Sequence, residues 1–131
     1  MIVVDASATV DYLIGATTFE RIRNRLEAPN EDLHAPHLLD IEVAHALRRL
    51  ALRRSLSPGR AEQALHDFAD MRLRRYPHAA LLARIWELRA NLSAFDAAYI
   101  ALAEALDAPL ITTDARLARA PGHRATIELV R

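Results

Sequence analysis

The sequence contains no cysteine, which excludes disulfide scaffolds, thiolate zinc sites and cysteine nucleophiles. Aromatic residues make up only 5% of the chain, which weighs against a surface that stacks single-stranded bases. Three glycines are present and none belongs to a phosphate-cradling loop, and the six histidines lack the spacing of metal ligands. Lysine is absent as well, so all seventeen basic residues are arginine. Any catalytic mechanism that needs a lysine is therefore excluded for this protein.

The sequence is rich instead in aliphatic residues. Hydrophobic residues make up 52% of the chain, so the core must be built from leucine, alanine, isoleucine and valine. A length of 131 residues fits one domain, and we predict a single domain over residues 1–131. The apolar N-terminus carries Asp5 and Asp11 and no basic lead-in, which is typical of neither a signal peptide nor a membrane span. We therefore expect a cytoplasmic protein with no membrane partner.

Short apolar runs alternate with segments of helical periodicity. Strands are predicted at 2–4, 33–35, 109–112 and 126–130. Helices are predicted at 8–14, 18–26, 38–54, 58–71, 78–91 and 94–106, with a helical turn after Asp114. In the helix at 78–91, the spacing turns Leu82 inward and Trp86 partly so. Strands separated by helices indicate an α/β fold, with a central parallel sheet flanked by helices on both faces.

Four carboxylates lie at junctions between these elements. Asp5 directly ends the first strand and Asp114 follows the strand at 109–112, while Glu42 and Asp96 lie in the first turns of two helices. Ligands of parallel sheets bind beyond the carboxyl ends of the strands. Acidic side chains that are distant in sequence are therefore expected to converge at this end of the sheet.

Each carboxylate also has a purely local explanation. Asp96 follows Ser93 by three residues and forms a capping-box pattern, whereas Asp5 and Asp114 are in positions to cap the helices that follow them. Glu42 complements a helix dipole. A buried Asp5 without a partner would be costly, however, and four converging carboxylates need a cation among them. Oxygen ligands alone suit Mg²⁺, with Mn²⁺ as the alternative ion.

Four segments that contain these acids resemble the PIN-domain family, and specifically VapC toxins of bacterial toxin–antitoxin systems. The similarity spans essentially the whole chain, and the last two motifs are the most specific. The segments are IVVDASATVDYL, LLDIEVAHALRR, SAFDAAYIALAEAL and PLITTDARLA.

The resemblance implies a Mg²⁺-dependent endoribonuclease with a PIN-like fold. It implies that both the catalytic and the metal-binding residues are Asp5, Glu42, Asp96 and Asp114. We expect Asp5 and Asp96 to hold the metal most directly. Ser7 and Thr112 match small hydroxyl positions beside this site, and packing or capping explains them equally well.

The resemblance also implies partners. These are an RNA substrate, a VapB-like antitoxin whose segment covers an apolar groove, and a second copy of the chain in a homodimer. Two arginine clusters, at 48–54 and 72–75, offer positive charge for a phosphate backbone, although helix ends exposed to solvent carry such charge without any ligand.

Three other interpretations stay open from the sequence. A phosphorylation-dependent receiver domain also places carboxylates and Mg²⁺ at strand ends, but such domains rely on a lysine that this chain lacks. A PIN-like binding or assembly module with little nuclease activity is a second alternative. The third is a nuclease that acts on DNA, because the residues alone do not distinguish the two nucleic acids.

Overall fold

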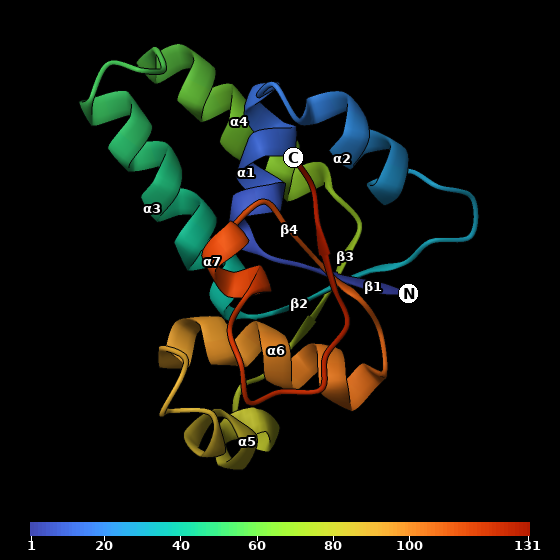
Figure 1. Cartoon of the computed structure of the whole chain (residues 1–131). Coiled ribbons are helices and arrows are strands. Elements are labelled where there is room, and N and C mark those ends of the chain that lie inside the picture. The colour runs from blue at the N-terminus through green and yellow to red at the C-terminus, as the bar shows by residue number, and fades with distance from the viewer.

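A five-stranded sheet lies at the centre of the molecule, in a computed structural model that describes all 131 residues (Figure 1). Its strands run in the order β3-β2-β1-β4-β5, and every neighbouring pair is parallel. The strands are β1 Ile2–Val4, β2 Leu33–Pro36, β3 Leu73–Tyr76, β4 Leu110–Thr112 and β5 Ile127–Leu129. The predicted parallel α/β fold is confirmed.

Helices cover both faces of this sheet, as expected. Figure 1 shows α1 (Ala6–Ile14), α2 (Phe19–Leu26), α3 (Leu38–Leu52) and α4 (Pro58–Asp70) on one side of it. The other side is covered by α6 (Ala94–Leu106), backed by η1 (Ala79–Leu81) and α5 (Leu82–Glu87), while α7 (Ala115–Ala118) lies between α3 and α6. None of these helices combines the length and the apolar character needed to cross a membrane.

The core forms around β1, β4 and α6. Both strands are fully buried because they occupy the middle of the sheet and are covered on both faces. Seven consecutive residues of α6, from 97 to 103, are also buried, because this helix lies between the sheet and α5. Alanines in this stretch allow the helix to pack closely. The first turn of α6, which carries Asp96, is thereby fixed relative to the ends of β1 and β4.

The helices begin at or near the capping residues that the sequence predicts. Asp5 caps α1, and Ser57 caps α4 with Pro58 at the first helical position. Ser93 caps α6 by accepting a hydrogen bond from the backbone N–H of Asp96 at 3.2 Å. Gly15 ends α1 with a φ of 68°, a left-handed conformation that glycine adopts without steric cost.

The structure corrects three details of the sequence prediction. Strand β3 was not predicted, because Leu73-Arg-Arg-Tyr76 is an edge strand without an apolar face. At the helix ends, α1 begins at Ala6 rather than 8, and α3 ends at Leu52 rather than 54. The segment at 78–91 divides into η1 and α5, and the exposed fractions of Leu82 and Trp86 are 62% and 66% rather than low. Of the residues in α5, Ile85 is the one that is buried, because this helix packs on α6 at the outside of the molecule.

Candidate active site

Asp5 is the most buried of the four predicted acids, with 5% of its surface exposed. Its Oδ1 accepts hydrogen bonds from the backbone N–H of Ala8 at 2.9 Å and from the hydroxyl of Ser7 at 2.7 Å. Its Oδ2 accepts a hydrogen bond from the hydroxyl of Thr112, at the end of β4. Burial raises the pKa of Asp5 to about 6, although these hydrogen bonds oppose the shift.

The hydroxyls of Ser7 and Thr112 join the ends of β1 and β4. They lie 3.1 Å apart, and each also accepts a hydrogen bond from a backbone N–H. Thr113 donates to Ser7 at 3.1 Å, and Asp114 donates to Thr112 at 3.0 Å. The two side chains that the sequence indicated as hydroxyl positions therefore hold the Asp5 carboxylate and fix the backbone before Asp114.

Glu42 lies half-buried on α3 and is held from across the site by Tyr99 of α6. The Tyr99 hydroxyl donates to Glu42 Oε1 at 2.6 Å, and 2% of the tyrosine surface is exposed. Burial raises the pKa of Glu42 against the lowering effect of this hydrogen bond. Tyr99 was not among the residues predicted from the sequence. Its spacing of three residues from Asp96 was the signal that could have found it, since residues three apart share a helix face.

Asp96 and Asp114 share an arginine that was also missed. Nη2 of Arg116 lies 3.3 Å from Asp96 Oδ2 and 3.3 Å from Asp114 Oδ2. Asp114 caps α7 as predicted, because its Oδ1 accepts from the backbone N–H groups of Arg116 at 2.8 Å and Leu117 at 3.3 Å. The pKa of Asp96 is raised by burial, an effect that the Arg116 charge opposes.

The four predicted acids lie at the same end of the sheet, where the charges of some of them shift the pKa values of others. The charge of Asp114 raises the pKa values of both Asp5 and Asp96, and the charge of Asp96 raises that of Glu42. Nevertheless, no three histidine, aspartate or glutamate side chains are grouped closely enough to hold a metal ion in this arrangement. The structure brings the acids to one place but does not gather them into a coordination sphere.

The donor set is nonetheless suited to a hard divalent cation. All four side chains offer carboxylate oxygens, which Mg²⁺ and Mn²⁺ prefer. An ionised carboxylate has about four lone-pair positions, and Asp5 uses three of them within the chain. Its remaining position is on Oδ2. A cation is also already present between Asp96 and Asp114, in the form of the Arg116 guanidinium. The type of donor, though not the present spacing of the carboxylates, therefore suits a hard divalent cation.

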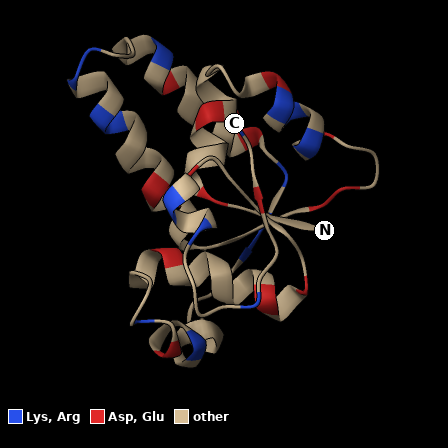
Figure 2. Ribbon diagram, viewed as in Figure 1, with Lys and Arg blue, Asp and Glu red and all other residues tan.

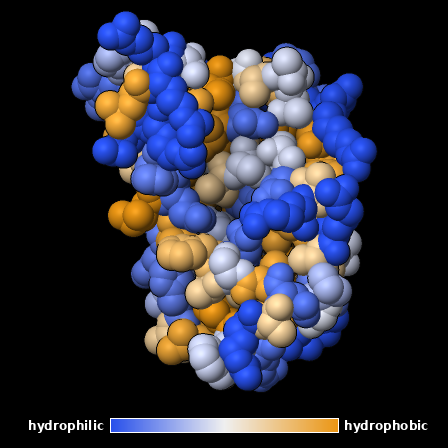
Figure 3. Space-filling model, turned by 60° about the vertical axis from the view of Figure 1, so that its left-hand side comes forward, coloured by the Kyte–Doolittle hydropathy of each residue, from blue (hydrophilic) through white to orange (hydrophobic).

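A groove of about 290 Å³ lies between α1 and α3 and adjoins this site at Ser7. Its lining includes Ser7 and is mainly apolar along Val10, Ile14 and Leu50. Its charged residues are Asp11, Arg49 and Arg53. Figure 2 shows basic positions on the far half of α3, and Figure 3 shows hydrophobic and hydrophilic side chains mixed on this side of the molecule, around a hollow. The first arginine cluster thus has two members in this groove.

The second arginine cluster lies elsewhere. Arg72 and Arg74 line a hollow at the starts of β2 and β3, which is the opposite end of the sheet from Asp5. Arg75 is paired with Asp40 at 2.8 Å. This cluster is therefore not placed to act together with the four carboxylates.

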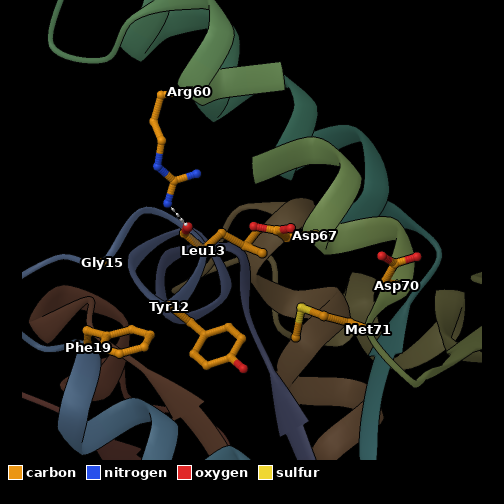
Figure 4. Close-up of a pocket in the computed structure, with 8 residues that line it drawn as sticks. All are labelled: Tyr12, Leu13, Gly15, Phe19, Arg60, Asp67, Asp70 and Met71. Atoms are coloured by element: carbon orange, nitrogen blue, oxygen red, sulfur yellow. Dashed lines mark hydrogen bonds between the residues drawn. The ribbon is translucent and has the colours of Figure 1, made fainter. Parts of the chain in front are cut away.

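Another hollow, of about 480 Å³, contains none of the predicted site residues. It lies where α1 meets α2 and α4, and Arg60 closes one side by donating to the carbonyl of Leu13 at 2.6 Å (Figure 4). Phe19 and Tyr12 stack at its other side. The size of a hollow therefore does not locate the candidate site; the convergence of carboxylates does.

The sequence of this chain was compared with those of known proteins, and the matches show its family. Residues 2–123 match the PIN domain. This chain is a VapC-type member of the PIN-domain family. It is 49% identical to the VapC ribonuclease Mb0985 of Mycobacterium bovis over 117 residues, 89% of this chain and 88% of that protein. It is 46% identical to ribonuclease VapC1 of Mycobacterium tuberculosis over 130 residues, 98% of this chain and 97% of that protein.

Solved structures share the fold of this chain at lower sequence identity. A chain in the crystal structure of VapBC2 from Rickettsia felis, bound to a DNA fragment from their promoter, superimposes with a TM-score of 0.70 at 18% identity. Each chain is covered completely. This structure confirms the fold, while the match to the PIN domain and the identity to VapC ribonucleases confirm the family resemblance seen in the four sequence motifs.

The buried carboxylate of Asp5 predicts an unusual effect of substitution on stability. Because its pKa is raised to about 6 in the folded state, folding favours the protonated form, and stability falls as pH rises from about 4 through 6. Asp5→Asn removes this charge. In EDTA we expect the variant to be more stable than the parent protein by about 2 kcal/mol at pH 7.5, with the gain lost at pH 4.

Urea denaturation at the two pH values measures this difference. Asp11→Asn is the matched control, because Asp11 is a more exposed acid on the same helix. An Asp5→Asn protein less stable than its parent at pH 7.5 would show that the capping role of the carboxylate outweighs its burial.

Proposed function

We propose that this protein is a Mg²⁺-dependent endoribonuclease toxin of a type II toxin–antitoxin system. The observation that carries the proposal is the convergence of Asp5, Glu42, Asp96 and Asp114 at one end of the sheet, in a chain closely related to VapC ribonucleases. The proposed reaction is hydrolysis of RNA phosphodiester bonds. An RNA-cleaving toxin meets its substrate in the cytoplasm, which is where we place it.

In this proposal all four carboxylates form the active site. Asp5 and Asp96 hold Mg²⁺, or Mn²⁺ in its place, most directly, and Glu42 and Asp114 complete the set of ligands. When bound, the ion supplies a water of lowered pKa and neutralises charge on the phosphate. The contribution of the protein is to hold these carboxylate oxygens in fixed orientations.

The surrounding residues orient the carboxylates. Ser7 and Thr112 fix the plane of the Asp5 carboxylate through one hydroxyl on each oxygen. Tyr99 holds Glu42 by Oε1, which leaves Oε2 without a partner in the chain and able to accept a hydrogen bond from a water molecule. A carboxylate whose pKa is raised by burial is also a better proton acceptor near neutral pH. We therefore assign Glu42 to orient the attacking water.

The test is cleavage of a panel of structured RNAs with Mg²⁺ or with EDTA. We expect discrete cleavage that requires Mg²⁺ and that Asp5→Asn or Asp96→Asn slows by about a hundredfold or more, because the loss of a ligand removes several kcal/mol of transition-state stabilisation. Asp70→Asn serves as the control, because Asp70 is an exposed acid at the end of α4 and outside the groove, and it should cleave at the parental rate.

Matched DNA strands distinguish the alternatives. Cleavage of DNA in preference to RNA would indicate a DNA nuclease. A protein that neither binds Mg²⁺ nor cleaves any strand would be a binding or assembly module, and the proposed activity would be wrong.

Arg49 and Arg53 are proposed to bind the RNA backbone as it enters the groove beside Ser7. The Arg49→Gln/Arg53→Gln variant should show a raised KM and a weaker salt dependence of KM, with the logarithmic slope reduced by about 0.7 for each phosphate that the variant no longer binds. Cleavage assays across a salt series measure this. The Arg48→Gln/Arg54→Gln variant, with the same charge change outside the groove, should keep the parental slope; equal slopes in all three proteins would remove Arg49 and Arg53 from the RNA path.

Two protein partners belong to the proposal. The apolar lining of the groove between α1 and α3 suits a segment of a VapB-like antitoxin, which would cover the site. A second apolar surface is formed by Leu82 and Phe95, with exposed fractions of 62% and 59%, around a small hollow between α5 and α6. Exposed apolar patches of this kind mark interfaces, and we assign this one to the homodimer.

Light scattering after gel filtration tests the dimer. The parent protein should have the mass of two chains, and Leu82→Arg should have the mass of one, because the arginine charge would be buried in the interface. Leu65→Arg changes an exposed leucine on α4 and should leave the dimer intact. A monomeric parent protein, or a dimeric Leu82→Arg variant, would contradict the assignment.

A further inference from the structure

Arg116 is the only arginine in contact with the four acids. One of its nitrogens, Nη2, contacts a carboxylate oxygen from α6 and another from the cap of α7, each at 3.3 Å. The rest of the side chain has no partner, and 77% of its surface is exposed. The guanidinium therefore lies at the mouth of the site, between Asp96 and Asp114.

The geometry of this contact is that of a weakly held group. Charge-assisted hydrogen bonds of arginine are usually about 2.7–2.9 Å long and often pair two nitrogens with one carboxylate. Here a single nitrogen is shared at a longer distance, in a position open to solvent and salt. The contact contributes little energy and is easily broken.

The backbone beneath this side chain is held firmly. The N–H of Arg116 donates to Asp114 Oδ1 at 2.8 Å, and the N–H of Ala118 donates to the Asp114 carbonyl at 3.1 Å. The guanidinium is thus free to move away while Asp114 and the start of α7 stay in place. Departure of the side chain requires only rotation about its own bonds.

The positive charge offsets a repulsion that exists without it. Asp114 is close enough to Asp96 for its charge to raise the pKa of the Asp96 carboxyl, and the charge of Arg116 acts in the opposite direction. A divalent cation held by the same oxygens would perform the same neutralisation with twice the charge. Two cations cannot occupy this position together, so they must compete for it.

We propose that Arg116 is a placeholder cation, which holds Asp96 and Asp114 in the metal-free protein, is displaced when a divalent metal binds, and then contacts a phosphate of the nucleic acid. This inference rests on the proposed metal-dependent function of the same carboxylates. Arginine suits both tasks, because its planar fork pairs with carboxylate and phosphate alike. Once the metal neutralises the carboxylates, the freed guanidinium attracts the phosphate, which an acidic site alone would repel.

Metal binding to the protein alone tests the first part. Mn²⁺ titration followed by electron paramagnetic resonance compares the parent protein with Arg116→Gln and with the control Arg119→Gln, an exposed arginine at the end of the same helix that makes no ion pair. In the parent protein, Mn²⁺ must displace the two solvent-exposed ion pairs of Arg116. Arg116→Gln lacks these pairs and should therefore bind Mn²⁺ about three- to tenfold more tightly. The control should bind Mn²⁺ as the parent protein does.

Thermal unfolding separates a placeholder from a simple structural ion pair. We expect Arg116→Gln to have a lower Tm than the parent in EDTA, because the two aspartates repel each other, and an equal Tm at saturating Mn²⁺. A structural ion pair would lower Tm in both conditions. RNA cleavage at saturating Mg²⁺ tests the second part: Arg116→Gln should raise KM with kcat little changed.

Asp96→Asn distinguishes failure of this inference from failure of the proposed function. If the parent binds Mn²⁺, Asp96→Asn loses binding and Arg116→Gln binds no more tightly than the parent, only the placeholder role is wrong. An unchanged KM would remove the phosphate contact. If neither the parent nor Arg116→Gln binds Mn²⁺, the metal site and the placeholder fall together.

Discussion

The burial of the Asp5 carboxylate at the end of β1 is the constraint on which the candidate site depends. A carboxylate in this position is stable only with donors around it, and the chain supplies them from α1 and from the end of β4. The contact with Thr112 joins two central strands that are far apart in sequence. Because β4 leads directly to Asp114, the hydrogen bonds that satisfy Asp5 also set the position of the second acid.

The other pair of acids depends on α6. This helix is buried over seven consecutive residues, so the orientation of its first turn is fixed by the core rather than by solvent-exposed contacts. Asp96 points from that turn toward Arg116, and one turn later Tyr99 reaches across to Glu42 on α3. A single helix therefore positions two of the four acids. Packing energy in the core thus maintains an arrangement of like charges that would otherwise separate.

Much of this arrangement follows from the sequence because it depends on local patterns. The apolar run before Asp5, the serine caps at 57 and 93 and the strand before Asp114 have local signals, and all are present in the structure. Strand β3 lacks such a signal, since an edge strand with two adjacent arginines gains its stability from pairing with β2. The exposure of Leu82 depended on how α5 packs, which periodicity does not reveal.

The contacts of the site were less predictable than its residues. Tyr99 and Arg116 act on Glu42, Asp96 and Asp114 through space, and the pairing depends on the angle at which α6 meets α3 and α7. Sequence spacing places Tyr99 and Asp96 on one face of a helix but does not state what that face meets. The same limit applies to the arginine clusters, of which only Arg49 and Arg53 line the groove that adjoins the site.

One carboxylate can both cap a helix and belong to the active site, because each role uses a different oxygen. In Asp114, Oδ1 accepts from the N–H groups that begin α7, whereas Oδ2 faces Arg116. In Asp5, Oδ1 caps α1 and Oδ2 turns to Thr112 with one lone pair left. Asp96 differs, since Ser93 caps the helix and neither Asp96 oxygen is used for capping; its Oδ2 contacts Arg116. For Asp5 and Asp114, the local explanation therefore does not weaken the functional one: the cap fixes one oxygen, and the fixed carboxylate plane sets the direction of the other.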